Sequence, residues 1–331
     1  MRHLTIVEFG TYLGVTGNRL TVHNKDGKVY ETALSRLRTI RIAKKGVSVS
    51  TDLLLALAAR GIRLFVLDWR GLGVVALSGN NQHGVVSLRE SQFAFLADEE
   101  RCFLLAKSFI AGKISNQRSV ILYFGKYHRR KDERIDVLLT ETSSRLSTSL
   151  ENLKNIRFNE NWRQSLLGIE GEAAKNYWGF YRSSRLMPES FFNREGRGAL
   201  EITNAALNYG YAILESYVWS AIDNAGLELF KGVLHQKRPG KPSLVLDVME
   251  EYRSWVVDRN IVKLASQISR EEILSKTLKK RIVEEIDKTM TNKILWHGKY
   301  IRLENVLQRQ IYKLSGHFCT GLGYKPLIFK W

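Results

Sequence analysis

The feature that most constrains the fold is a change in the spacing of apolar residues at about residue 85. Before this point, short stretches rich in β-branched and aromatic residues alternate with turn residues, which is typical of strands. We predict strands at 5–9, 19–23, 28–31, 38–42, 62–67 and 71–76. After this point, apolar residues recur about every 3.6 residues, as in helices. We therefore predict an α+β protein, with a small β-rich N-terminal domain (1–85) and a larger all-α C-terminal domain (86–331).

Turn and capping residues mark several boundaries in the β-rich part. Asp26-Gly27 is typical of a two-residue hairpin turn, because such turns need positive φ angles. Ser50 can cap a short helix at 51–60, and Gly61 can end that helix in a left-handed conformation. Together these signals predict a hairpin followed by one helix inside the β-rich domain.

Similar signals divide the rest of the chain. The segment 78–84 is rich in Gly and Asn and is predicted to be the linker between the two domains. Ser269 and Glu272 have the spacing of a capping box, which predicts a helix from there to about residue 288. A later amphipathic helix is predicted at 302–314.

The chain is strongly basic, with 51 Lys and Arg residues against 33 Asp and Glu residues and a net charge of +18. Such a charge attracts polyanions, and nucleic acid is the usual partner because neutralised phosphates release counterions. An acidic membrane surface, or a basic surface that serves only solubility, remains an alternative. The β-rich part holds no cluster of acids, so we expect any metal chemistry in the helical part.

Several other classes are disfavoured by the sequence. Cys102 and Cys319 are too few for a four-thiolate zinc cluster or a disulfide framework. The chain has no run of 18 apolar residues and no secretory apolar segment near its start. We therefore expect a cytoplasmic protein with no membrane partner.

Glu170 is the first candidate for chemistry. It follows an apolar run and lies between Gly168 and Gly171, where we expect a helix to begin. Glycines at such positions let another backbone or a ligand come close. The alternative is that Glu170 only favours the positive end of a helix dipole.

A polar stripe on an otherwise apolar helix is the second candidate. The helix is predicted at 202–224, and its stripe consists of Asn204, Asn208, Tyr211 and Glu215. Buried polar groups need partners, so the stripe must face either a structural polar network or a functional cleft.

The third candidate combines His235 with Asp247 and Glu250, which lie three residues apart on one face of a predicted amphipathic helix. One His with two or three carboxylates suits Mg²⁺ or Mn²⁺ better than structural zinc. Such a cation can clamp phosphate oxygens during phosphodiester chemistry. The basic residues beside the His would contact neighbouring phosphates. These residues are Lys237, Arg238 and Lys241. Arg41, Lys44 and Lys45, in the β-rich part, are weaker candidates for such contacts.

These three segments resemble the motifs of the CRISPR-associated protein one family. Its Glu-Gly-x-Ala-Ala-x-x-Tyr motif matches 170–177, and its Asn-x-x-x-Asn-Tyr-Gly-Tyr motif matches 204–211. Its Gly-x-x-His motif matches 232–235, followed by Ser-Leu-x-x-Asp-x-x-Glu-x-x-Arg at 243–253. All three occur in the family's order, and the resemblance covers essentially the whole chain. One departure is at 198–201, where many members have Pro-x-Asp.

The resemblance implies specific roles for these residues. Glu170, His235 and Glu250 would be metal ligands, and Asp247 would support them as a fourth catalytic residue. Tyr177, Asn204, Asn208 and Tyr211 would line the site. Three other acids, Glu172, Glu251 and Asp258, match no family ligand and are expected on the surface.

The resemblance also implies an activity and partners. The protein would be a metal-dependent DNA endonuclease and integrase of CRISPR spacer acquisition, with Mg²⁺ or Mn²⁺ as cofactor. It would join the 3′-hydroxyl ends of short DNA fragments to the CRISPR repeat by transesterification. It would form a homodimer, partly through the β-rich domain, and bind a dimer of the small CRISPR-associated protein two. The alternatives are a non-catalytic basic nucleic-acid scaffold and a metal-dependent RNase.

Overall fold

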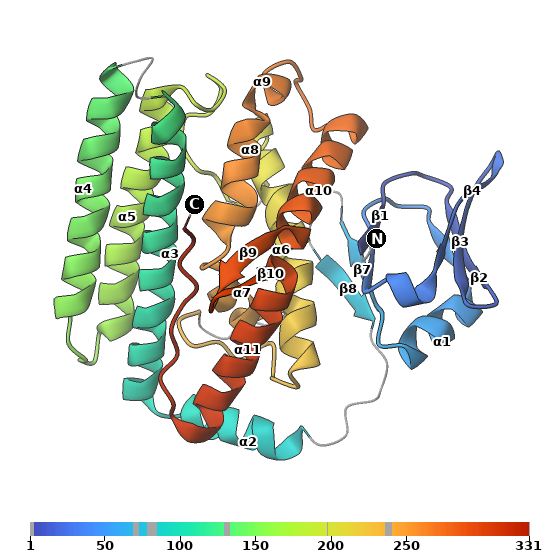
Figure 1. Cartoon of the computed structure of the whole chain (residues 1–331), viewed down its shortest axis with the longest axis horizontal. Coiled ribbons are helices and arrows are strands. Elements are labelled where there is room, and N and C mark those ends of the chain that lie inside the picture. The colour runs from blue at the N-terminus through green and yellow to red at the C-terminus, as the bar shows by residue number, and fades with distance from the viewer. Residues whose placement is uncertain are drawn as a thin grey trace.

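Two four-stranded sheets form the N-terminal end of the chain (Figure 1). The computed structural model describes residues 3–68, 73–77, 85–128, 133–196, 198–235 and 240–330. The elements of the β-rich part are β1 (His3–Ile6), β2 (Tyr12–Thr16), β3 (Arg19–Asn24), β4 (Gly27–Ala33), the 3₁₀ turn η1 (Leu34–Arg36), β5 (Thr39–Ile42), β6 (Ser48–Val49), α1 (Thr51–Ala59), β7 (Arg63–Leu67) and β8 (Gly73–Leu77).

The two sheets differ in strand direction. In the order β1-β5-β7-β8, the first three strands are parallel and β8 is antiparallel to β7. In the order β4-β3-β2-β6, only the short β2–β6 pair is parallel. Leu13 on β2, Ile40 on β5 and Leu53 on α1 are fully buried in one shared apolar cluster. The sheets and α1 therefore enclose a core of their own.

The predicted helix at 51–60 is confirmed with its cap. Ser50 Oγ accepts a hydrogen bond of 3.2 Å from the backbone N–H of Leu53, and Gly61 follows with a φ of +64°. The hairpin is also confirmed, but its turn begins one residue earlier than predicted. Asn24 pairs with Gly27, so Asp26 lies within the turn and Gly27 starts β4.

The rest of the chain is mainly helical and confirms the predicted α+β class (Figure 1). Its elements are α2 (Val86–Phe95), α3 (Glu99–His128), α4 (Glu133–Asn155), α5 (Trp162–Ser184), α6 (Ile202–Asn224), α7 (Ser243–Met249), the π-helix η2 (Arg253–Asp258), α8 (Arg259–Lys263), α9 (Ala265–Ile268), α10 (Lys276–Thr291), β9 (Lys293–Trp296), β10 (Lys299–Arg302) and α11 (Leu303–Thr320). The β9–β10 hairpin is an addition that the apolar spacing did not reveal. The predicted linker at 78–84 lies outside the described residues, so the boundary at residue 85 stays a prediction.

Helices α3, α4 and α5 pack side by side on one flank, while α6 packs against α7, η2, α10 and α11 (Figure 1). Helix α6 has the predicted bounds and is buried on most of its faces. At the segment that departs from the motif, Glu201 caps α6 by accepting hydrogen bonds from the backbone N–H groups of Thr203 and Asn204. In the described part of the chain, none of the helices is long and apolar enough to cross a bilayer.

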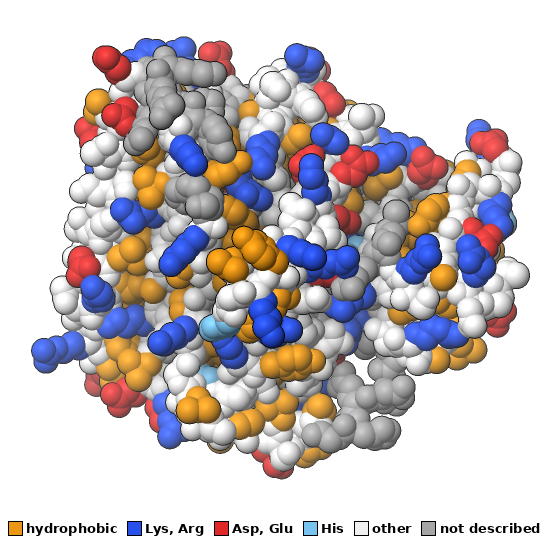
Figure 2. Space-filling model, in the orientation of Figure 1, with side chains coloured by type: hydrophobic (Ala, Val, Ile, Leu, Met, Phe, Trp, Pro, Cys, Tyr) orange, Lys and Arg blue, Asp and Glu red, His pale blue; other side chains and the backbone are white. Residues whose placement is uncertain are grey.

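The basic character of the sequence is visible on the surface. Figure 2 shows Lys and Arg side chains over the helical part and over the β-rich end of the same face, with fewer Asp and Glu side chains among them. This distribution agrees with the net charge of +18. Both parts of the chain therefore expose positively charged side chains on this face.

The predicted capping box at Ser269 is wrong. The hydroxyl of Ser269 donates to Ala265 O at the end of α9, and no helix begins at the residues that follow it, 270–275. Helix α10 starts later, and Ser275 Oγ accepts the capping hydrogen bond from the backbone N–H of Leu278 at 3.2 Å. The amphipathic helix predicted at 302–314 is confirmed as α11, which continues to Thr320.

We expect Ser275→Ala to lower the free energy of unfolding by about 1 kcal/mol, because it removes the acceptor for an otherwise unpaired N–H group. Urea denaturation measures the change. Ser269→Ala is the matched control and should change stability by only a few tenths of a kcal/mol, about the level of ordinary surface substitutions. A larger loss in the control would restore Ser269 as the cap.

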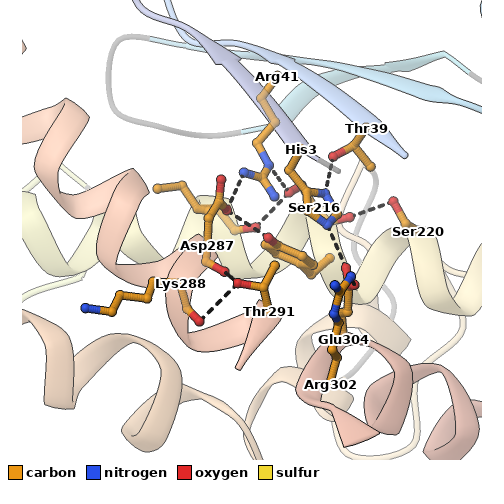
Figure 3. A network of polar contacts seen from close by, with 12 residues as sticks. His3, Thr39, Arg41, Ser216, Ser220, Asp287, Lys288, Thr291, Arg302 and Glu304 are labelled. Carbon is orange, nitrogen blue, oxygen red and sulfur yellow. Dashed lines mark hydrogen bonds and ion pairs between the residues drawn. The ribbon is translucent and has the colours of Figure 1, made fainter. Parts of the chain in front are cut away.

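A polar network joins the β-rich part to the helical part (Figure 3). Arg41 on β5 is fully buried, and its guanidinium lies 2.9 Å from Asp287 on α10 and donates to Ser216 on α6 at 2.7 Å. His3 on β1 lies 2.9 Å from a carboxylate oxygen of Glu304 on α11. Arg41 was a weaker candidate for DNA contact, and this prediction is wrong because its side chain has no exposed surface.

Candidate active site

Three distant segments bring two predicted metal ligands to one ammonium group. Lys113 on α3 forms a close ion pair with Glu170 on α5, and its Nζ lies 2.7 Å from Glu250 Oε2 in the turn after α7. Arg253 Nη2 lies 3.1 Å from the other oxygen of Glu250. Glu170 and Glu250 thus share a cation although they are far apart in the sequence.

The two cations keep Glu250 ionised. Burial alone would raise the pKa of Glu250, but the charges of Arg253 and Lys113 outweigh burial and lower this pKa to about 2. Burial alone would likewise lower the pKa of Lys113, yet Glu250 and Glu170 raise it above its ordinary value. A carboxylate with so low a pKa is fully charged at neutral pH, as a ligand for a hard cation must be.

Glu170 lies in the middle of α5 rather than at a helix start. The expectation that a helix begins there is therefore wrong, and so is the alternative that Glu170 serves the positive end of a helix dipole. A Cβ added at Gly168 or Gly171 would meet no atom within 4 Å among the described residues. The surface of α5 is thus uncovered at these two glycines.

His235 is oriented by Asp247. The carboxylate of Asp247 is buried, and its Oδ1 lies 2.5 Å from His235 Nδ1. The same carboxylate accepts hydrogen bonds from the backbone N–H groups of Val233 and Leu234. Gly232 allows this approach, since a Cβ there would lie 2.6 Å from Asp247 Oδ2. If His235 Nδ1 donates to Asp247, its Nε2 is left for a metal or a phosphate.

Burial alone would lower the pKa of His235, but the hydrogen bond and charge of Asp247 raise it above its ordinary value, with a smaller contribution from Glu250. However, within the described ranges, no group of three or more His, Cys, Asp or Glu side chains has an arrangement that could hold a metal ion. The three-ligand set therefore stays a prediction, with two of its members in contact with the same ammonium.

The segment that carries Glu250 is not the amphipathic helix that we predicted. Helix α7 is buried throughout and ends at Met249, and after a turn the chain continues as the π-helix η2. Two acids in this segment, Glu251 and Asp258, were expected on the surface and are instead buried. Burial raises the pKa of Glu251 to about 7 and that of Asp258 to about 6. Glu172, by contrast, is exposed as expected.

Asp258 connects two of the predicted site-lining residues. The hydroxyl of Tyr211 donates to Asp258 Oδ1 at 2.5 Å, and that of Tyr177 donates to Asp258 Oδ2 at 3.0 Å. Tyr211 and Glu250 line the same cavity, whereas Tyr177 is fully buried and is not part of the cavity lining. Of these two residues, Tyr211 is therefore the one beside the candidate ligands.

Asn204 and Asn208 of the polar stripe form hydrogen bonds with the loop at 193–196. Arg194 Nη1 donates to Asn204 Oδ1 at 3.0 Å, and Nη2 donates to Asn208 Oδ1 at 2.6 Å. Asn208 also donates to Gly196 O, and Asn204 donates to Asn193 O. The stripe thus forms a polar network whose effect is to fix Arg194 next to Tyr211.

Two of the predicted DNA contacts, Lys237 and Arg238, lie outside the described residues. Lys241 is partly buried after that gap, while Lys44 and Lys45 are exposed at the end of the β-rich sheet. Their roles stay predictions.

Sequence reasoning missed Lys113 and Arg194 and gave no role to Arg253. The sequence offers one signal for Lys113, because it is a single Lys inside the apolar stretch 109–114 of a long helix. Arg253 lies within one of the family motifs. Arg194 has no such local mark, because only the folded loop brings it to the site.

The fold and site define a class of protein. It is a basic α+β protein in which a helical region holds an acid pair around one cation, beside a His–Asp pair. Residues 4–292 match the family model for "CRISPR associated protein Cas1". The chain therefore belongs to the Cas1 family, which confirms the resemblance seen in the motifs.

Individual relatives agree with this assignment. The chain is 46% identical over 332 residues to the "CRISPR-associated endonuclease Cas1 1" of Francisella tularensis subsp. novicida, with 100% of both chains covered. Its fold is similar to that of a "Casposase bound to integration product", with a TM-score of 0.83, 23% identity and coverage of 100% and 95%. It is also similar to part of a "Cas6-RT-Cas1--Cas2 complex", with a TM-score of 0.79, 20% identity and coverage of 99% and 36%. At such identities the two structures support the fold alone.

Proposed function

We propose that this protein is a metal-dependent DNA endonuclease and integrase of CRISPR spacer acquisition. It joins 3′-hydroxyl ends of short DNA fragments to the CRISPR repeat by transesterification. The observation that carries the proposal is that Glu170 and Glu250, from separate motifs, converge on one cation. The names of the Francisella relative and of the casposase complex, together with the net charge of +18, support the same activity.

We further propose that Glu170, His235 and Glu250 hold Mg²⁺ or Mn²⁺. Glu250 supports this proposal, because its buried carboxylate is held ionised between Lys113 and Arg253 and so has the charge that a metal ligand needs. Its neighbour is the ammonium of Lys113, so the site already favours positive charge. A divalent cation, when bound, supplies charge stabilisation to the reacting phosphate.

The chain's own residues prepare the site. Asp247 holds the ring of His235 through Nδ1 and accepts a hydrogen bond from the backbone N–H of His235, so His235 keeps one orientation. Arg253 offsets part of the charge of Glu250. Lys237, Arg238 and Lys241 would bind phosphates next to the reacting one, which positions the DNA strand.

The proposed partners are a second copy of this chain and a dimer of the small protein Cas2. The name of the solved "Cas6-RT-Cas1--Cas2 complex" supports the second partner. We assign part of the homodimer interface, and some DNA contacts, to the β-rich N-terminal domain.

The test is integration of a short DNA duplex into a plasmid that carries a CRISPR repeat, with Cas2 present. We expect joined product with Mn²⁺ or Mg²⁺ and none with EDTA. Product that forms equally in EDTA would contradict the metal proposal. DNA binding without product under any metal would favour the non-catalytic scaffold, and cleavage of RNA with intact DNA would favour the RNase.

A further inference from the structure

A cavity of about 210 Å³ is lined in part by Glu250, and the function proposed above assigns it no ligand. Its walls include three cationic side chains, those of Lys113, Arg194 and Arg253. The cavity is smaller than the ~300–1,000 Å³ pockets that hold drug-sized ligands, so it suits a single small group. The cations indicate that this group is an anion.

Arg194 supplies positive charge that no carboxylate contacts directly. Its guanidinium is partly buried and donates to the neutral side-chain amides of Asn204 and Asn208. In the parts of the chain that the structure covers, it forms no ion pair with a carboxylate, and its charge acts on Asp258 only as a minor influence that opposes the rise in the pKa of that acid. The same guanidinium lies 5.2 Å from the centre of the Tyr211 ring. Arg194 is therefore held at the cavity by neutral groups, and its charge is left for a ligand.

The acids at the cavity are already engaged. Glu250 lies between Lys113 and Arg253, and Asp258 accepts hydrogen bonds from the hydroxyls of two tyrosines. An anion that entered the cavity would thus meet a guanidinium without a paired carboxylate, rather than a pair of free acids.

The walls also hold polar atoms that lack partners. Arg253 Nε and Ser254 Oγ are buried, and none of the described residues forms a hydrogen bond with them. Buried donors without partners are costly, and a bound ligand is one way to satisfy them. Both residues lie in the π-helix η2, a rare conformation that occurs frequently at functional sites.

We propose that this cavity binds one phosphate group of the nucleic-acid strand that enters the site, with Arg194 and Arg253 as its donors. Planar guanidinium groups suit phosphate oxygens, because two N–H groups can bind two oxygens at once. Glu250 lines the same cavity, so a phosphate held there lies next to the candidate ligands of the reacting phosphate. The inference rests on the proposed function and adds a subsite to it.

The first test is Arg194→Gln in the full chain with Cas2, with the short DNA duplex as substrate. We expect KM for the duplex to rise about 10- to 100-fold, as for the loss of hydrogen bonds to a charged group. The catalytic constant kcat should be nearly retained. The slope of log affinity against log salt should become shallower by about 0.7–0.9, the value for one lost phosphate contact. Arg157→Gln removes the same charge from an exposed position and should leave KM unchanged.

Because Arg194→Gln could misfold the loop that carries it, a second variant tests the subsite without changing that loop. Ala174 lines the cavity, so Ala174→Leu fills part of it without removing a charge. We expect it to raise KM in the same direction. A wild-type KM in Ala174→Leu would overturn the subsite even if Arg194→Gln binds weakly, because Arg194 would then act through its charge alone. Joining by the wild-type protein, measured in parallel, reports separately on the proposed function.

Discussion

Alanine in place of His235 is expected to lower the rate of DNA joining about 10³-fold or more, while DNA binding at low salt persists. The proposed cation contributes several kcal/mol of charge stabilisation, and a loss of ~4 kcal/mol corresponds to about 10³ in rate. Binding persists because it depends on the net charge of +18 and the basic residues, which this substitution leaves in place. Joining assays with Mn²⁺ and a binding titration at low salt measure the two quantities.

Two further variants separate the role of His235 from a general loss of histidine or of structure. His297→Asn changes an exposed His in the β9–β10 turn and should leave the joining rate unchanged. Asp247→Asn keeps the ring but weakens the group that orients it, and such supporting residues typically contribute about 10- to 100-fold. Joining at the wild-type rate in His235→Ala would remove His235 from the site, whatever the other two variants do.

The supporting role of Asp247 could be predicted because it lies within a motif that the sequence shows directly. The structure places its carboxylate against His235 Nδ1. The cations between the acids could not be predicted in the same way. Lys113 reaches Glu170 and Glu250 only because α3 and α5 pack side by side, and such packing leaves no local pattern.

Predictions of the fold were likewise correct where the signal is local in the sequence and wrong where tertiary contacts decide the outcome. Helix α6 has the predicted bounds, since its apolar run is long and Gly226 takes a positive φ just beyond its end. Glu251 and Asp258 were misplaced because an acid is normally exposed, and only their partners in the folded chain explain their burial. For Glu251 these partners come from the C-terminal segment, where the hydroxyl of Tyr324 donates to it at 2.7 Å.

The second large effect concerns the network between the two parts of the chain. We expect Arg41→Met to lower the free energy of unfolding by about 3–5 kcal/mol, the usual result when one member of a buried ion pair is removed. The substitution takes away the hydrogen bonds to Asp287 and Ser216 and the contact of the guanidinium with the Tyr217 ring, whose centre lies 4.5 Å from Cζ. The midpoint of urea denaturation measures the loss.

Lys44→Met is the matched control, because it removes a positive charge from an exposed side chain close to Arg41 in the sequence. Its effect on stability should lie within about 0.5 kcal/mol. DNA affinity and its salt dependence, measured where the Arg41→Met protein is still folded, should equal those of the wild type. If Arg41→Met were as stable as the wild type and bound DNA more weakly, Arg41 would be a DNA contact after all, and the burial that joins β5 to α6 and α10 would not persist in solution.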